Sequence, residues 1–183
     1  MKRDEIWRNI KGNKKAQVWI ETVIYLLIAF VMIGLVLSFI RPKIEEIRDK
    51  AIIEQSLEVI RDIENLILTI GSPGNKRLLE IEIRKGNLIF DCTNDKVFFQ
   101  INSKYVYTEP GENVEIGNVM ALTENKGEYN VVTLERDFSD VYNLTYKNED
   151  MLKTLNKAST PYKVYLTNNG EISNKIVMDF DLE

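Results

Sequence analysis

An uncharged run of eighteen residues, Val23 to Ile40, constrains this 183-residue chain more than any other feature. Thirteen of the eighteen are Leu, Ile, Val or Phe, and on a membrane-insertion scale they contribute about −4 to −8 kcal/mol. A helix over residues 18–40 would be about 34 Å long, which matches the hydrocarbon core of a bilayer. A buried helix of a soluble protein fits poorly, since such helices rarely stay apolar on every face for so long. We therefore predict a transmembrane helix over about residues 18–40.

Charge is distributed unevenly around this run. Residues 1–16 hold six basic and two acidic side chains, a net charge of +4, whereas the whole chain carries −4 and residues 17–183 therefore carry −8. Basic residues gather on the cytoplasmic side of membrane helices. We predict a single-pass protein of the cell membrane with its N-terminus in the cytoplasm and its C-terminal part outside, in contact with membrane lipid. Phosphate contacts need clustered Lys or Arg, so the acidic remainder predicts no nucleic-acid partner.

A periodic segment follows the apolar run. Between Ile44 and Ile70 the apolar residues recur mainly at steps of three and four, which predicts an amphipathic helix over about residues 44–70. Pro42 lies between the two helical segments. Because proline lacks the amide donor and restricts the residue before it, we expect a helix kink or short break there. The sequence Gly71-Ser72-Pro73-Gly74 ends the helix.

Beyond residue 75 the apolar pattern changes to the period of two that is typical of strands. Predicted strands lie at 79–84 paired with 88–90, at 97–101 paired with 105–108, at 118–122 and at 129–135, with a short helix at 150–156. A closing hairpin is expected from Tyr162 to Leu182, with its turn at Asn168-Asn169-Gly170. The predicted fold class is α+β, with a small antiparallel sandwich or barrel-like head packed on the amphipathic stripe. The parts are a basic leader (1–16), a long helix (17–70) and a β-rich extracellular head (75–183).

The junction between the leader and the apolar run carries a short motif. Lys14, Lys15, Ala16 and Gln17 precede the run, and Glu21 follows Gln17 by four residues. A secretory signal is cleaved after its apolar region at small residues, but Arg41-Pro42-Lys43-Ile44 stands there instead. A peptidase that acts on this chain should therefore cut before the helix and leave the helix in the mature protein.

This arrangement resembles the class III signal peptide of archaeal type IV pilins and archaellins. The resemblance covers residues 14 to about 40 and the plan of a helix followed by a β head. It implies that a prepilin peptidase recognises Lys14 and Lys15 and cuts between Ala16 and Gln17. Family members commonly carry Gly at the position of Ala16 and a small polar residue at that of Trp19.

Glu21 would be the fifth residue of the mature chain. The resemblance implies that its carboxylate pairs with the new N-terminal ammonium, on its own chain or on a neighbour, and sets the register of assembly. The alternative is an interfacial carboxylate that reaches the lipid headgroups. The first role corresponds to a structural subunit, major or minor, of a type IV pilus-like surface filament that is built from copies of this chain or related subunits. The second corresponds to a single-pass anchored extracellular binding or sensor module that does not polymerise.

Three further features are weaker. Gly34 and Ser38 are four residues apart, a spacing that permits close helix packing but also arises by chance. Asn143-Leu144-Thr145 is an N-glycosylation sequon, which is frequent by chance in an Asn-rich chain. The chain has no histidine and one cysteine, Cys92, and shows no catalytic motif. We expect no enzyme activity, no cofactor and no metal site.

Overall fold

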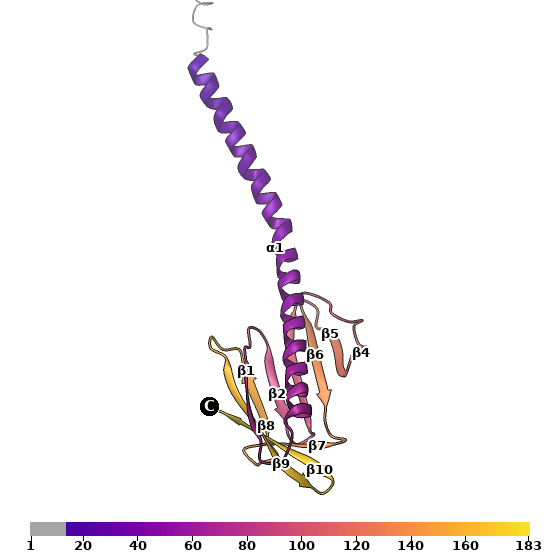
Figure 1. Ribbon diagram of the computed structural model, residues 1–183. Coiled ribbons are helices and arrows are strands. Elements are labelled where there is room, and N and C mark those ends of the chain that lie inside the picture. The colour runs from indigo at the N-terminus through magenta and orange to yellow at the C-terminus, as the bar shows by residue number, and fades with distance from the viewer. Residues whose placement is uncertain (1–13) are drawn as a thin grey trace, which may run out of the picture. The chain divides into compact units, whose positions relative to one another are not determined.

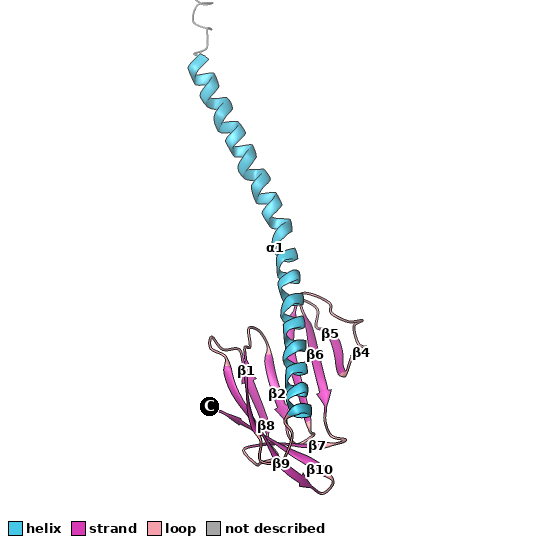
Figure 2. Ribbon diagram, in the orientation of Figure 1, coloured by secondary structure: helices cyan, strands magenta, loops and turns pink. Residues whose placement is uncertain are grey.

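The computed structural model describes residues 14–183, with side chains from Val18 onward (Figure 1). One helix, α1 (Lys14–Thr69), precedes ten strands (Figure 2). The predicted α+β plan of a long apolar N-terminal helix followed by a β-sheet head is confirmed. The described residues divide into two compact units, one up to residue 44 and one of residues 45–183, so the C-terminal part of α1 belongs to the same unit as the strands. We call residues 45–183 the head unit.

The ten strands form two sheets. The four-stranded sheet has the order β1 (Lys76–Ile81), β9 (Tyr162–Ile172), β10 (Lys175–Leu182), β7 (Tyr142–Tyr146). The six-stranded sheet has the order β4 (Asn113–Ile116), β5 (Val119–Asn125), β6 (Asn130–Asp137), β3 (Lys96–Ser103), β2 (Asn87–Asp91), β8 (Leu152–Asn156).

The expectation of a purely antiparallel head is wrong at one pair, since β7 and β10 are parallel. Parallel neighbours need a long crossover connection. Here the chain leaves β7 for β8 at the edge of the six-stranded sheet and returns through β9 before it forms β10.

The amphipathic stripe of α1 is buried in the head unit from Ile53 onward. At most 5% of each side chain is exposed at Ile53, Leu57, Ile60, Ile63, Ile67 and Ile70. Ile44 and Ile47, which the same pattern predicted to be covered, are 51% and 69% exposed. Asp49 joins α1 to a loop of the head unit, because it accepts a hydrogen bond from the Lys104 backbone N–H at 2.7 Å. The apolar stripe is therefore covered only beyond Ile47.

Both sheets share a single apolar core with the helix. The rings of Phe90 on β2 and Phe180 on β10 lie 4.5 Å apart between centroids, and both are almost fully buried. Inward-facing residues alternate along the strands, as in β3, where Val97, Phe99 and Ile101 are buried. This is the period of two that the sequence shows.

Three predicted elements differ from the structure. Residues 105–108 form no strand, because the Ser103 hydroxyl bonds both the backbone N–H and the carbonyl of Tyr105 and turns the chain out of the sheet. The segments predicted as a first pair, 79–84 and 88–90, correspond to β1 and β2 in different sheets. Residues 150–156 contain strand β8 rather than a short helix, because Leu155 lies opposite Leu88 in the core.

The predicted closing hairpin forms, but its turn lies later in the chain. Asn168-Asn169-Gly170 continues β9, and the turn consists of Ser173 and Asn174, whose φ angles are 53° and 66°. Left-handed φ at both central residues is the geometry of a tight hairpin turn, which Asn tolerates well. A register shift opposite Val177 and Met178 accommodates the longer strand.

Candidate functional site

The apolar part of α1 presents its side chains outward on every face. All described large apolar residues from Val18 to Ile40 are exposed, from 37% at Val23 to 77% at Phe39. The most apolar window of this helix has a mean hydropathy of 2.9, and none of it is buried. A helix that is apolar on all sides is unstable in water and is typical of a membrane span. The segment is long and apolar enough to serve as a single-pass membrane anchor.

The predicted leader lies mostly outside the described residues, which begin at Lys14. The backbone of Lys14, Lys15, Ala16 and Gln17 forms the first turn of α1, and their side chains also lie outside the described part. The predicted cleavage site, between Ala16 and Gln17, lies at the N-terminal end of α1 in the described part of the chain and stays a prediction.

Glu21 lies one helical turn after Gln17 and is exposed. The next residue, Thr22, donates its hydroxyl hydrogen to the Val18 carbonyl oxygen at 2.9 Å, so that polar group is satisfied within the helix. An internal bond of this kind suits a hydroxyl in an apolar environment. Between Lys14, where α1 begins, and Val23, where the uncharged run begins, the acidic residue is Glu21.

Gly34 and Ser38 both lie in the exposed apolar segment, one turn apart. A Cβ added at Gly34 would meet nothing within 4 Å. The missing side chain is therefore not required by packing within this chain, and close packing against another helix stays a prediction. Pro42 lies within α1, which is not interrupted there. The short break is absent, since one missing backbone hydrogen bond is tolerated by a helix this long, and the kink at Pro42 stays a prediction.

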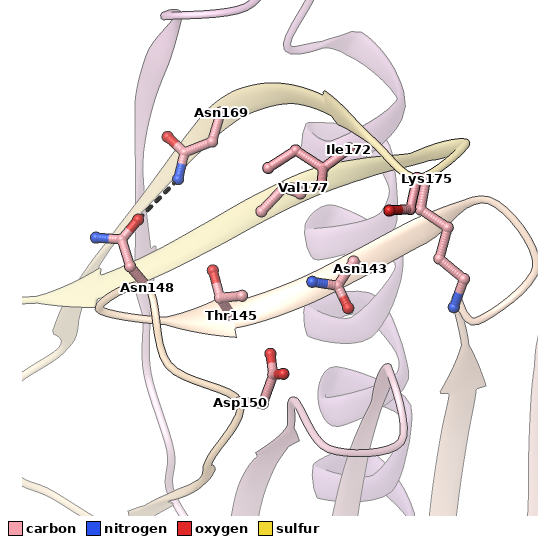
Figure 3. Close-up of a pocket in the computed structure, with 9 residues that line it drawn as sticks. Asn143, Thr145, Asn148, Asp150, Asn169, Ile172, Lys175 and Val177 are labelled. Atoms are coloured by element: carbon pink, nitrogen blue, oxygen red, sulfur yellow. Dashed lines mark hydrogen bonds between the residues drawn. The ribbon is translucent and has the colours of Figure 1, made fainter.

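Asn143 lies on β7 at the edge of the four-stranded sheet and is half-buried. It lines a groove of about 810 Å³ together with residues of β7, β9, β10 and the adjoining loops, including Thr145, Asn148, Asn169 and Lys175. In Figure 3 Asn148 and Asn169 are joined by a hydrogen bond, 3.0 Å long, across one end of this groove. The Thr145 hydroxyl, which belongs to the sequon, already donates to Asp179 Oδ1 at 2.7 Å. The folded strand thus holds the sequon in an extended, hydrogen-bonded conformation.

Four buried carboxylates form an unexpected feature of the head unit: Asp49, Glu64, Asp95 and Asp179 are each at most 8% exposed. Each joins segments that are distant in sequence. Glu64 Oε1 on α1 accepts hydrogen bonds from Asn118 Nδ2 at 2.9 Å and from Arg136 Nε at 2.8 Å. In the sequence, Asp179 alternates with Asp181 and resembles a residue on a solvated strand face. Its partners lie more than thirty residues away, so the local sequence holds no signal for its burial.

The groups that could support catalysis are few. The Cys92 thiol is buried, and burial together with the neighbouring Asp91 carboxylate raises its pKa to about 12. It is therefore protonated at neutral pH and a poor nucleophile. In the described part of the chain, no group of three His, Cys, Asp or Glu residues is arranged to hold a metal ion.

Comparison of this chain with protein-family models, with curated proteins and with solved structures finds no match.

Proposed function

We propose that this chain is a structural subunit, major or minor, of an archaeal type IV pilus-like surface filament that assembles through α1. The observation that carries the proposal is the division of α1 into two halves of different character. The large apolar residues from Val18 to Ile40 are exposed on all sides of the helix, whereas Ile53 to Ile67 complete the core of the head unit. The head unit buries its own apolar stripe, so the first half of α1 is left for a membrane and then for packing against other helices.

Glu21 extends this proposal to a mechanism of assembly. Removal of residues 1–16 would leave an ammonium on Gln17, one turn from the Glu21 carboxylate of the same chain or beside that of a neighbour. In the dry core of a bundle of apolar helices, unpaired charges are strongly disfavoured. Pairing of the two groups then selects one axial register between subunits. The basic leader supports a cytoplasmic N-terminus, where a prepilin peptidase acts, and an outer head.

The second candidate is a single-pass anchored binding module that does not polymerise. The groove beside Asn143 favours it, because a cavity of about 810 Å³ with an apolar floor at Val177 and polar walls is large enough for a small molecule. The two functions differ in what they require of Glu21. A binding module needs only the anchor, whereas a filament subunit needs the carboxylate.

The proposal predicts that Glu21→Gln leaves membrane insertion and leader removal intact but sharply reduces incorporation into filaments. Insertion should be unimpaired because the change removes a charge from an apolar helix. The measurement is the amount of this chain in filaments sheared from cells of its native host, relative to the amount in their membranes. Glu21→Asp is the matched control, since it keeps the charge and should retain more incorporation than Glu21→Gln. Equal incorporation of Glu21→Gln and wild type would show that Glu21 is only an interfacial carboxylate.

A further inference from the structure

Four segments that are distant in sequence bring five basic residues to one groove of the head unit. The groove has a volume of about 440 Å³ and is lined by Arg48 on α1, Arg84 and Lys85 between β1 and β2, Lys104 after β3 and Lys157 after β8. Its acidic lining residues are Glu45 and Asp49. The lining thus carries a net charge of +3 in a chain whose total is −4. We call it the basic groove.

The floor of the basic groove is built by Asp49, which is 4% exposed. One of its carboxylate oxygens binds the Lys85 ammonium, and the other accepts the Lys104 backbone N–H at 2.7 Å. This single buried carboxylate therefore holds two lysine-bearing loops against α1. The Ala158 N–H donates to the Ile83 carbonyl at 3.3 Å and ties the Lys157 loop to the Arg84 loop. These contacts hold the loops that carry the basic residues close together in the folded head unit.

Three of the five basic side chains have no carboxylate partner in the described part of the chain, whereas Arg84 is paired with Glu82 at 3.1 Å and Lys85 is paired with Asp49. Neither Arg48 nor Lys157 forms an ion pair with any side chain in the described part of the chain, and both are exposed. The Lys104 ammonium donates to the neutral Glu128 carbonyl at 2.5 Å and so keeps its net charge. Half-buried Ile52 adds an apolar wall. Such a basic lining suits a phosphate group.

The position of the groove along the chain identifies the source of that phosphate. Arg48 follows Ile40, the end of the uncharged run, by only eight residues, which in a helix corresponds to a rise of about 12 Å. When residues 18–40 span a bilayer, Arg48 is therefore confined to the headgroup region or its immediate vicinity. Clustered Lys and Arg beside a membrane span attract anionic lipid, and the attraction is strongest within about 10 Å at physiological salt.

We propose that the basic groove is a docking site for the phosphate headgroup of an anionic phospholipid. The proposal rests on the membrane anchoring of α1 but not on filament assembly. Arg48 and Lys157 bind the phosphate at the rim, and Lys85 and Lys104 are positioned behind it by Asp49.

Lipid retention by the full chain tests this docking site. The protein is transferred to neutral detergent micelles doped with equal amounts of phosphatidylglycerol and phosphatidylcholine of identical acyl chains, and the retained lipids are counted by native mass spectrometry. Wild type should retain one phosphatidylglycerol in preference to phosphatidylcholine by roughly tenfold, and Arg48→Gln/Lys157→Gln should lose most of that preference. Arg77→Gln/Lys163→Gln changes the charge equally on the exposed four-stranded sheet and should keep the preference.

Circular dichroism of each variant confirms that the head unit is folded before lipids are compared. Equal retention of the two lipids by wild type would overturn the proposal, as would an unchanged preference in Arg48→Gln/Lys157→Gln. If this variant keeps its lipid preference but no longer enters filaments, the groove binds an acidic protein surface and the lipid assignment is wrong. Because the assay scores lipid retention, its result is independent of whether Glu21 directs assembly.

Discussion

At the scale of single residues, Glu58 and Glu64 show how differently two carboxylates on one helix are used. Both face an arginine. Glu58 pairs with Arg61 at 2.6 Å on the outer face, where its side chain is 63% exposed. Glu64 is 7% exposed and accepts hydrogen bonds from Asn118 and Arg136, which lie beside and on the six-stranded sheet. Only the second pair links α1 to the sheet, so only the second should matter to stability.

We predict that Glu64→Ala lowers the free energy of unfolding of the head unit by about 1–3 kcal/mol, because Arg136 and Asn118 lose a buried acceptor. Glu58→Ala should change it by less than about 0.5 kcal/mol. The measurement is urea unfolding of the detergent-solubilised full chain, followed by near-ultraviolet circular dichroism of the tyrosines of the head unit. Similar destabilisation by both substitutions would contradict the bridging role of Glu64.

Residue-level chemistry was predictable where it depends on neighbours in sequence. The Lys14-to-Glu21 motif and the sequon at Asn143 can be identified directly, because their members lie within a few positions of one another. The buried carboxylates and the basic groove could not be predicted in this way. The ion pairs of Asp49 with Lys85 and of Asp95 with Lys175 span 36 and 80 residues, and they exist only once both sheets are assembled.

At the scale of elements, α1 combines two helical segments whose stabilities have different origins. The first depends on an apolar environment, and the second depends on five aliphatic side chains buried in the core that the helix shares with both sheets. The spacing of apolar residues alone predicts the second helical segment, but it does not show where the sheets begin to cover that segment. This is why Ile47 follows the apolar pattern and is nevertheless 69% exposed.

This contrast gives a matched pair of substitutions on one helix. Ile60→Ala should destabilise the head unit by about 2–5 kcal/mol, because Ile60 is fully buried and its removal leaves a cavity. Ile47→Ala should cost less than about 0.5 kcal/mol, because no packed neighbours are lost. The same urea unfolding assay measures both changes. A small effect of Ile60→Ala would mean that the sheets form a stable core without α1.

Strand prediction succeeded where alternation is long and failed where tertiary contacts decide. Strands β5 and β6 and the β9–β10 hairpin were predicted close to their observed positions. Strand β8 was not, because only Leu155 of its five residues is buried and the remaining pattern carries little periodicity. The hairpin turn was misplaced because Asn168-Asn169-Gly170 has strong turn composition. In the structure Asn168 instead donates to the Gly71 carbonyl at 2.7 Å and joins β9 to the end of α1.

At the scale of the whole molecule, the order of parts was predictable and the order of strands was not. Hydropathy and periodicity separate a membrane helix from a β-rich head, since each reflects a different solvent for the chain. The crossing of the chain between two sheets, and the parallel β7–β10 pair that results, depend on contacts that periodicity does not encode. The function proposed for the molecule depends on the junction between leader and helix, which stays a prediction.

The mass of the mature N-terminal peptide, measured on protein extracted from membranes of the native host, tests the proposed filament function most directly. A filament subunit processed by a prepilin peptidase should begin at Gln17, with residues 1–16 absent from the membrane-bound form. Replacement of Ala16 by a bulky charged residue should leave the precursor uncut, which provides the control for cleavage at this bond. A mature protein that begins at Met1 or Lys2 would contradict the account and favour a permanently anchored binding module.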